Sequence, residues 1–278
     1  MSERITLTIE DGVADLRLNR PDKMNALDPA MFDALLDVTG QLASRADVRA
    51  VVLSGEGRAF CSGLDMASMA GLASGDPKAV AGINPDLNPA RLRERTHGLA
   101  NAYQQVAWAW HQLPMPVIAA LHGVAYGGGL QIALGADIRL VSADLKMSVM
   151  EIRWGIVPDM AGMVLMRGLL RPDVMRELVY TGRTVSGAEA VQLGLATRLC
   201  SDPLNDARLL ARQIASHSPD AICAAKRLLN RAADAPAAEV LLAESVEQQR
   251  LLGQPNQIEA VRAGFEKRAP RFDNRSGS

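Results

Sequence analysis

Three consecutive glycines, Gly127-Gly128-Gly129, constrain the fold of this 278-residue chain more than any other feature. They follow the apolar run 117–121 and precede an apolar stretch that ends at about Gly135. Glycine has no Cβ atom, so the backbone at these positions can come very close to a neighbouring segment or to a ligand. The first N–H groups of a helix also lack partners within the helix and lie at the positive end of its dipole. The segment therefore predicts either a site for developing negative charge or tight packing of a helix on a sheet.

Strand and helix signals alternate over the first 150 residues. Asp11-Gly12 joins two segments of alternating polarity and predicts a β-hairpin. Asp28-Pro29 is typical of a helix start, and we expect that helix to end at about Ser44. Residues 50–53 predict a short buried strand, and residues 91–113 predict a helix. Alternating strands and helices favour an α/β fold with stacked ββα units.

The remainder of the chain, from residue 159 onward, is predicted to be mostly helical. Asp202-Pro203 and Ser218-Pro219 have the pattern of two helix starts. We predict a core over residues 1–200, a C-terminal helical region over 201–270 and a disordered tail over 271–278. The length allows one large domain or two small ones.

Charge and composition exclude several classes of protein. The 30 Lys and Arg residues nearly balance the 31 Asp and Glu residues, which argues against binding to nucleic acid or to an anionic membrane. No apolar run approaches the ~18 residues of a membrane span, and the N-terminus lacks a signal-peptide pattern. The three cysteines form no CxxC pair and the four histidines form no HExxH motif, so we expect no metal site and a reducing, cytoplasmic location.

Residues 58–65 (RAFCSGLD) form the second segment that could carry chemistry. Small residues and a glycine after a buried strand let the backbone approach a ligand, and unpaired N–H groups there could bind an oxyanion. The alternative is an ordinary turn between a strand and a helix, in which Asp65 caps the helix.

Residues 150–159 (MEIRWGIVPD) form the third such segment, because they place two carboxylic acids in apolar surroundings. Burial would raise the pKa values of Glu151 and Asp159 and suit them to carry protons. Alternatively, Glu151 faces solvent or pairs with Arg153. Asp159 could instead cap a helix over residues 160–170.

In this order and spacing, the three segments resemble the crotonase family, also called the enoyl-CoA hydratase/isomerase family. The resemblance covers nearly the whole chain. Its motifs are the segments 19–27 (NRPDKMNAL), 59–65 (AFCSGLD), 116–123 (PVIAALHG), 127–129 (GGG) and 265–268 (FEKR).

The resemblance implies an enzyme that acts on an acyl-CoA thioester, with coenzyme A as part of the substrate and no separate cofactor. It implies a crotonase-like spiral of ββα units, and a helical C-terminal region that forms a homotrimer or hexamer. The oxyanion hole would consist of the backbone N–H groups of Leu64 and Gly128. The implied CoA-binding residues are Lys23, Ala26, Ala59 and Lys267, with Lys267 reaching the ligand of a neighbouring subunit; the alternative for both lysines is solvated surface charge. Apolar residues after Asp159 that one chain would leave uncovered also favour assembly: Leu165, Leu169, Leu178 and Val179.

One residue departs from the family pattern. The family's hydratases carry glutamates at the positions of both Gln131 and Glu151, and glutamine cannot exchange a proton at neutral pH. Asp159 matches a catalytic aspartate of the family's dienoyl-CoA isomerases, although those enzymes also have an acid at the position of Gln131.

We therefore expect Glu151 and Asp159 to shift a double bond. The first alternative is hydration across C2=C3, with Gln131 positioning the substrate or the water. The second is a relative without catalysis that binds acyl-CoA or RNA.

Overall fold

The computed structural model describes residues 3–276, which form two β-sheets with helices around them. The larger sheet has the order β1-β2-β3-β4-β6-β9, and the smaller has the order β5-β7-β8. β1 pairs antiparallel with β2, and every other pairing in the larger sheet is parallel. The strands are β1 (Ile5–Glu10), β2 (Val13–Leu18), β3 (Ala50–Gly55), β4 (Val117–Leu121), β5 (Val124–Tyr126), β6 (Ile138–Val141), β7 (Lys146–Ser148), β8 (Val185–Ser186) and β9 (Arg198–Leu199).

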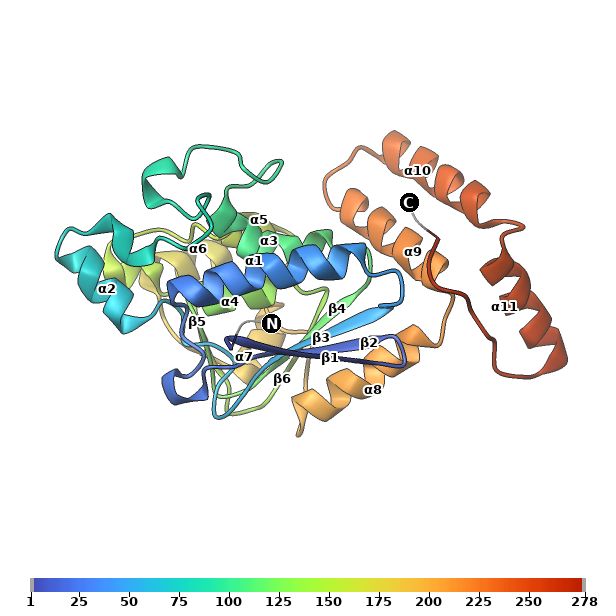
Figure 1. Cartoon of the computed structure of the whole chain (residues 1–278), viewed down its shortest axis with the longest axis horizontal. Coiled ribbons are helices and arrows are strands. Elements are labelled where there is room, and N and C mark those ends of the chain that lie inside the picture. The colour runs from blue at the N-terminus through green and yellow to red at the C-terminus, as the bar shows by residue number, and fades with distance from the viewer. Residues whose placement is uncertain (1–2, 277–278) are drawn as a thin grey trace.

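Helices cover both faces of the larger sheet. α8 lies on one face, and α1, α3 and α4 lie on the other (Figure 1). The helices are α1 (Pro29–Ser44), α2 (Met66–Ala73), α3 (Ala102–Gln112), α4 (Gly128–Leu134), α5 (Gly162–Arg167), α6 (Pro172–Thr181), α7 (Gly187–Leu193), α8 (Pro203–Ala215), α9 (Pro219–Ala232), α10 (Ala237–Leu251) and α11 (Pro255–Glu266), with 3-10 turns at η1 (Pro21–Lys23), η2 (Pro77–Val80), η3 (Pro89–Arg91) and η4 (Glu151–Trp154). The predicted α/β class is confirmed.

The first hairpin and the first helix lie where the local sequence signals predicted them. Asp11 and Gly12 both have positive φ, 49° and 78°, and join Glu10 to Val13 in a two-residue hairpin. The Asp28 carboxylate accepts a hydrogen bond of 2.9 Å from the N–H of Met31 and so caps α1.

The central strands β3 and β4 are buried along their whole length because helices cover both of their faces. On one face, three alanines of α8 at four-residue spacing pack against the sheet: Ala207, Ala211 and Ala215. Their small side chains let the helix lie close to the strands. α8, the first helix of the region predicted over residues 201–270, therefore packs directly on the core.

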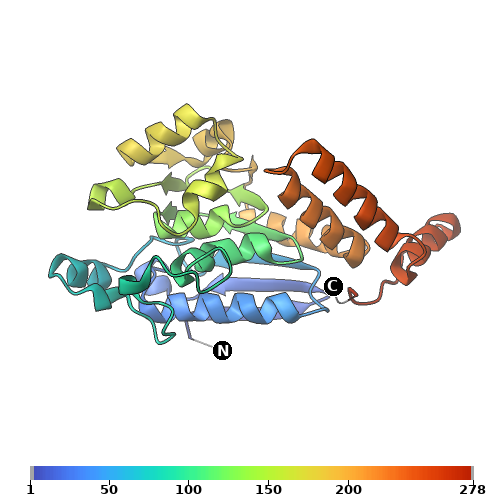
Figure 2. The ribbon, with the colours of Figure 1, turned by 90° about the horizontal axis from the view of Figure 1, so that it is seen from above.

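The last three helices, α9, α10 and α11, extend to one side of the sheet (Figures 1 and 2). Lys226 of α9 anchors them to the core. Its Nζ donates to Asp137 Oδ2 at 2.8 Å and to the carbonyl oxygens of Trp110 and Met115 at 3.2 and 3.0 Å. This buried ammonium therefore has three oxygen partners, as a charge removed from water requires.

The helix predicted over residues 91–113 is shorter in the structure. α3 begins at Ala102, where Asn101 and Gln104 form a capping box. The Asn101 side chain also donates to the carbonyl oxygen of Leu92 at 2.8 Å, which holds the preceding segment in a non-helical path.

The tail also differs from its prediction, because residues 271–276 are held to the rest of the chain by hydrogen bonds. Arg49 Nη2 donates to the carbonyl oxygen of Phe272 at 2.8 Å. The N–H of Asp273 donates to Asn256 Oδ1 at 2.9 Å, and Arg275 Nη2 donates to the carbonyl oxygen of Ala43 at 2.7 Å. Residues 277 and 278 of the predicted tail lie outside the described residues.

Two of the four apolar residues expected to be uncovered, Leu169 and Val179, are only partly buried, and the other two are buried. Leu165 and Leu178 are buried, because α5 packs on α4 and α6 packs on η4 and α5. The large apolar side chains that are most exposed on α10 and α11 are Leu241, Leu242 and Phe265, the last of which is 85% exposed. Within residues 3–276, no helix has the length and apolar character needed to cross a bilayer.

Candidate active site

Two backbone segments, residues 61–65 and 124–128, run side by side at the centre of the site. The N–H of Cys61 donates to the carbonyl oxygen of Val124 at 3.0 Å, and the N–H of Tyr126 donates to the carbonyl oxygen of Cys61 at 3.1 Å. Gly63 has a φ of +87°, and a Cβ atom there would lie 2.7 Å from the carbonyl oxygen of Tyr126. Only glycine allows this close approach.

These segments carry the two N–H groups predicted to form an oxyanion hole. The parallel bridge to Leu27 uses the carbonyl oxygen of Gly63 and the N–H of Asp65, so the N–H of Leu64 points away from it. Gly128 is the first residue of α4, where an N–H has no partner inside the helix. Across the described residues, neither the Leu64 N–H nor the Gly128 N–H has a backbone acceptor.

Cys61 lies in the same segment but is not activated as a nucleophile. Its side chain is buried, and its Sγ contacts the carbonyl oxygen of Asn25 at 3.1 Å. Burial raises the pKa of the thiol to about 12, so the thiol stays protonated at neutral pH.

Glu151 lies at the start of η4 with only 6% of its surface exposed, so the solvent-facing alternative is wrong. Its Oε1 accepts a hydrogen bond of 2.6 Å from Gln131 Nε2. Its Oε2 is buried and has no hydrogen-bond partner within residues 3–276. Buried polar atoms are normally paired, and an unpaired carboxyl oxygen marks a candidate position for chemistry.

Asp159 does not cap a helix, so that alternative is wrong as well. α5 begins three residues later, at Gly162, and its N-cap residue is Ala161, with a φ of 64° and no side-chain cap bond. Asp159 itself is exposed at the surface of the site, although the surrounding protein still affects its ionisation.

Gln131 bridges the segments of the two acids, because its side chain bonds both to Glu151 and to the N–H of Met160, the residue after Asp159. Burial raises the pKa of Glu151; the nearby charge of Asp159 raises it further, and the hydrogen bond from Gln131 works in the opposite direction. Partial desolvation also raises the pKa of Asp159. The pKa values of both carboxyls are thus raised toward neutral pH, where a carboxyl can both take up and release a proton.

Tyr103 belongs to the same region and was not predicted as a site residue. Burial, and then the charge of Asp159, raise the pKa of its hydroxyl. That hydroxyl donates to the carbonyl oxygen of Val80 at 2.9 Å and so joins α3 to η2. No sequence signal marks it, because it also has the spacing of an ordinary core residue on α3.

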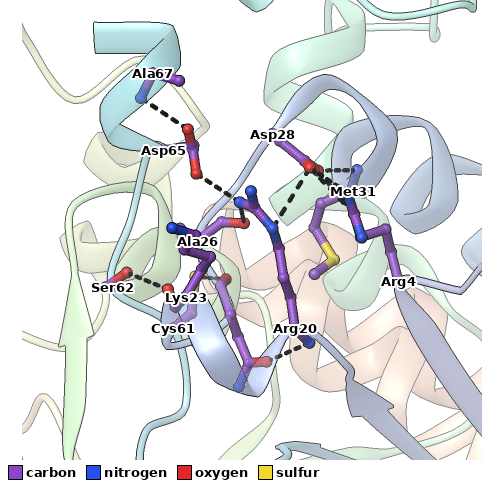
Figure 3. Close-up of polar contacts among 11 residues, drawn as sticks. Arg4, Arg20, Lys23, Ala26, Asp28, Met31, Cys61, Ser62, Asp65 and Ala67 are labelled. Carbon is purple, nitrogen blue, oxygen red and sulfur yellow. Dashed lines mark hydrogen bonds and ion pairs between the residues drawn. The ribbon is translucent and has the colours of Figure 1, made fainter. Parts of the chain in front are cut away.

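The predicted CoA-binding residues Lys23, Ala26 and Ala59 lie around one loop. Asn25, which the sequence analysis did not single out, holds this loop with a φ of 55°. Its Oδ1 accepts from the N–H of Arg20 at 2.7 Å, and its Nδ2 donates to the carbonyl oxygen of Ala59 at 2.8 Å. Lys23 is exposed, and its carbonyl oxygen accepts from Ser62 Oγ at 3.3 Å (Figure 3).

Lys267 lies elsewhere in the chain. It follows α11 directly and is exposed, with a φ of 53°. α11 lies at the opposite end of the molecule from α2, which follows residues 61–65 (Figures 1 and 2). A single chain therefore does not bring Lys267 to the loop that carries Lys23.

Comparison with known proteins gives one consistent family. Residues 8–275 match the family model described as enoyl-CoA hydratase/isomerase. A peroxisomal Delta(3,5)-Delta(2,4)-dienoyl-CoA isomerase of Arabidopsis thaliana is 30% identical over 273 residues, which cover 97% of this chain and 96% of that protein. The mitochondrial enoyl-CoA hydratase domain-containing protein 2 of Bos taurus is 29% identical over 268 residues, which cover 94% of this chain and 84% of that protein.

Solved structures agree with this result. The crystal structure of an enoyl-CoA hydratase from Bacillus anthracis superimposes with a TM-score of 0.83 at 27% identity, covering 97% of this chain and 98% of that chain. The relatives thus carry names from both reaction types, isomerisation and hydration.

Proposed function

The chain belongs to the enoyl-CoA hydratase/isomerase family, and we propose that within this family it shifts a double bond in an enoyl- or dienoyl-CoA thioester. The observation that carries the proposal is the arrangement of the acids. Within the described residues, Oε2 of Glu151 is buried and has no hydrogen-bond partner, and its other oxygen accepts from the amide of Gln131. Gln131 also accepts from the N–H of Met160, so the adjacent Asp159 lies in the same region. Two separated acids suit the removal of a proton at one carbon and its return at another.

The proposed reaction has two steps. In the first, a C–H bond at C2, next to the thioester carbonyl, breaks, its proton moves to Oε2 of Glu151, and its electron pair forms an enolate. In the second, the O–H bond of protonated Asp159 breaks and a C–H bond forms further along the acyl chain. The proton balance is restored when Glu151 releases its proton and Asp159 takes one up from water.

The unpaired N–H groups of Leu64 and Gly128 would hold the enolate oxygen. A preorganised donor of this kind contributes about 2.7–4 kcal/mol to transition-state stabilisation. The support here is that both groups are free of backbone acceptors across the described residues and lie on adjacent segments.

Binding of the CoA portion is proposed at the loop of Lys23, Ala26 and Ala59. Lys267 would come from a neighbouring subunit of a homotrimer or hexamer, because it lies far from this loop in its own chain. The two lysines would pair with phosphates, and coenzyme A would enter as part of the substrate.

Hydration of a 2-enoyl-CoA is the second candidate. It is favoured by the hydratase names among the relatives and by the free Oε2, which could activate one water molecule. It lacks the second carboxyl next to Glu151, since Gln131 occupies that place.

The test is a substrate panel assayed with the purified protein: a 3,5-dienoyl-CoA, a 3-enoyl-CoA and a 2-enoyl-CoA. We expect the ultraviolet spectrum to show double-bond shift in one of the first two, with deuterium incorporated from D2O. Hydration of the 2-enoyl-CoA at ~10 s⁻¹ or more, with no double-bond shift, would overturn the proposal in favour of the second candidate.

A further inference from the structure

Gln131 lies on α4 and has only 2% of its surface exposed. The sequence analysis expected it to position the substrate or a water molecule. In the structure its carboxamide contacts protein on both sides. Oε1 accepts hydrogen bonds from the N–H groups of Met160 and Gly162 at 2.8 and 2.9 Å, and Nε2 donates to Glu151 Oε1 at 2.6 Å.

These partners define the orientation of the carboxamide. The two backbone N–H groups can only donate, so they require the amide oxygen, and a carboxylate oxygen can only accept, so it requires the amide nitrogen. The reversed orientation would place the NH2 group against two donors and the amide oxygen against a carboxylate. A single orientation therefore satisfies all three bonds.

This orientation has a consequence for Glu151. Because Oε1 faces an N–H donor, a proton bound to Glu151 must be on Oε2. The hydrogen bond also fixes the orientation of the Glu151 carboxyl group, so Oε2 points in one defined direction.

It also has a consequence for Asp159. The N–H of Met160, the next residue, and that of Gly162 are bound to the same amide oxygen. Between them, Ala161 has a left-handed φ of 64°, which is uncommon for a residue with a side chain and needs support from its surroundings. Gln131 supplies two hydrogen bonds to this strained turn.

We propose that Gln131 is a positioning residue that holds both acids: it restricts proton transfer by Glu151 to Oε2 and fixes the turn that carries Asp159. This inference rests on the proposed function for the roles of the two acids. A residue that only filled space would leave the ionisation of Glu151 unaffected.

The first experiment replaces the amide with an acid, Gln131→Glu. One oxygen of the new carboxyl can still accept from Met160 and Gly162, and the other would face Glu151 Oε1 at hydrogen-bond distance. Two such carboxyls share one proton, so one of them should stay protonated to higher pH. We expect the protonated-carboxyl infrared band, assigned by its loss in Glu151→Gln, to persist to higher pH by about one unit or more. Gln213→Glu, on the exposed side of α8, adds the same charge as a control.

The second experiment measures amide hydrogen exchange in the wild-type protein and in Gln131→Met. Methionine has a similar length but does not replace the three hydrogen bonds of the carboxamide, since its thioether cannot donate and is only a weak acceptor. We expect slow exchange at Met160 and Gly162 in the wild type and at least tenfold faster exchange in the variant. This measurement needs no substrate, and its wild-type half needs no variant to fold.

The two sets of results separate the hypotheses. Unchanged infrared titration in Gln131→Glu, or rapid wild-type exchange at Met160 and Gly162, would overturn the positioning role. If both measurements turn out as expected but the wild type shifts no double bond in the substrate panel, the proposed function fails while the hydrogen-bonded arrangement of Gln131 remains supported.

Discussion

Arg20 and Asp65, 45 residues apart in the chain, form an ion pair in which Arg20 Nη1 lies 2.6 Å from Asp65 Oδ2 (Figure 3). The other oxygen of Asp65 accepts from the N–H of Ala67 at 2.8 Å and caps α2. Arg20 Nη1 also donates to the carbonyl oxygen of Ala26 at 3.2 Å. The ion pair thus ties the loop proposed to bind CoA to the segment that carries the Leu64 N–H.

Asp65→Asn should destabilise the fold in a pH-dependent way. Burial opposes ionisation of Asp65, but the hydrogen bonds from Arg20 and Ala67 outweigh it and leave the pKa below the ordinary 3.8. The folded state therefore binds this proton less tightly than the unfolded state, and the ion pair adds stability above pH 3.8 that is lost as the pH falls through the folded pKa. Asparagine can still cap α2. We expect chemical denaturation at pH 7 to show a loss of about 2 kcal/mol, as for a hydrogen bond to a charged group, and a smaller loss at pH 3. A loss that does not depend on pH would contradict this account.

Glu151→Gln should lower activity and raise stability. Loss of the proton acceptor should reduce the double-bond shift by about 10²–10⁴-fold. Burial raises the pKa of Glu151 above the ordinary 4.5, so the folded state binds the proton more tightly than the unfolded state, and stability falls as the pH rises above 4.5. Glutamine does not ionise, so the variant does not lose this stability as the pH rises. Thermal unfolding should give a higher Tm for the variant at pH 7 and a smaller difference at pH 4, with the exposed Glu10→Gln as the control.

Asp159→Asn separates a proton carrier from a structural residue. Asp159 caps no helix, so asparagine should not lower the Tm; because partial desolvation raises the pKa of Asp159, removal of its charge should leave the Tm at pH 7 unchanged or slightly higher. The double-bond shift should fall by about 10²–10⁴-fold, because the amide cannot return a proton. Asp144→Asn, in the exposed turn between β6 and β7, is the matched control. Activity within twofold of the wild type would remove Asp159 from the mechanism.

The elements that could be predicted from the sequence depend on local signals. Asp28-Pro29 marks the start of α1, and Asp11-Gly12 marks the hairpin, because the capping and turn chemistry lies within a few residues. Residues 91–101 were predicted to be helical as part of the segment 91–113. There the Asn101 side chain bonds to the carbonyl oxygen of Leu92, and this contact overrides helix propensity.

The residues of the site could be predicted more readily than their arrangement. Glu151 and Asp159 stand out as acids in an apolar segment, and the glycines mark the close backbone approach. The bonds of Gln131 to Glu151 and to Met160 span 20 and 29 residues, and they depend on how β5, β7 and α5 are placed around α4. No local sequence pattern encodes contacts between residues so far apart in the chain, so the hydrogen bonds of Gln131 could be found only in the structure.

The exposed apolar side chains of α10 and α11 predict that the chain assembles with further copies of itself, and the family resemblance implies a trimer or hexamer. Ile258, Val261 and Phe265 are exposed on α11, and Phe265 is 85% exposed. Covering such side chains contributes about 25 cal/mol per Å² of apolar surface. Light scattering at micromolar concentration should give three or six times the 29.7 kDa mass of the chain, and Phe265→Glu should lower that mass. A stable monomer of the wild type would contradict the prediction.

Gly128→Val should reduce turnover by two orders of magnitude or more, because the added side chain would lie where the thioester is proposed to approach the Gly128 N–H. Loss of one oxyanion-hole donor costs about 10²–10³-fold in turnover. A Cβ atom at this position would lie 2.8 Å from Met160 Sδ and 2.9 Å from Leu27 Cδ1. Both atoms belong to flexible side chains, so the fold can adjust, and circular dichroism should show the wild-type spectrum.

Two further variants show whether the loss comes from the site or from packing. Gly128→Ala adds the Cβ atom alone and should give an intermediate loss, since the two flexible side chains can move away from one methyl group. Gly40→Val, on the exposed face of α1 where a Cβ atom meets nothing within 4 Å, adds the same branched side chain far from the site and should keep full turnover. If Gly128→Val had near wild-type activity with the same substrate, Gly128 would serve only to let α4 pack against Met160 and Leu27, and the enolate oxygen would have to bind elsewhere.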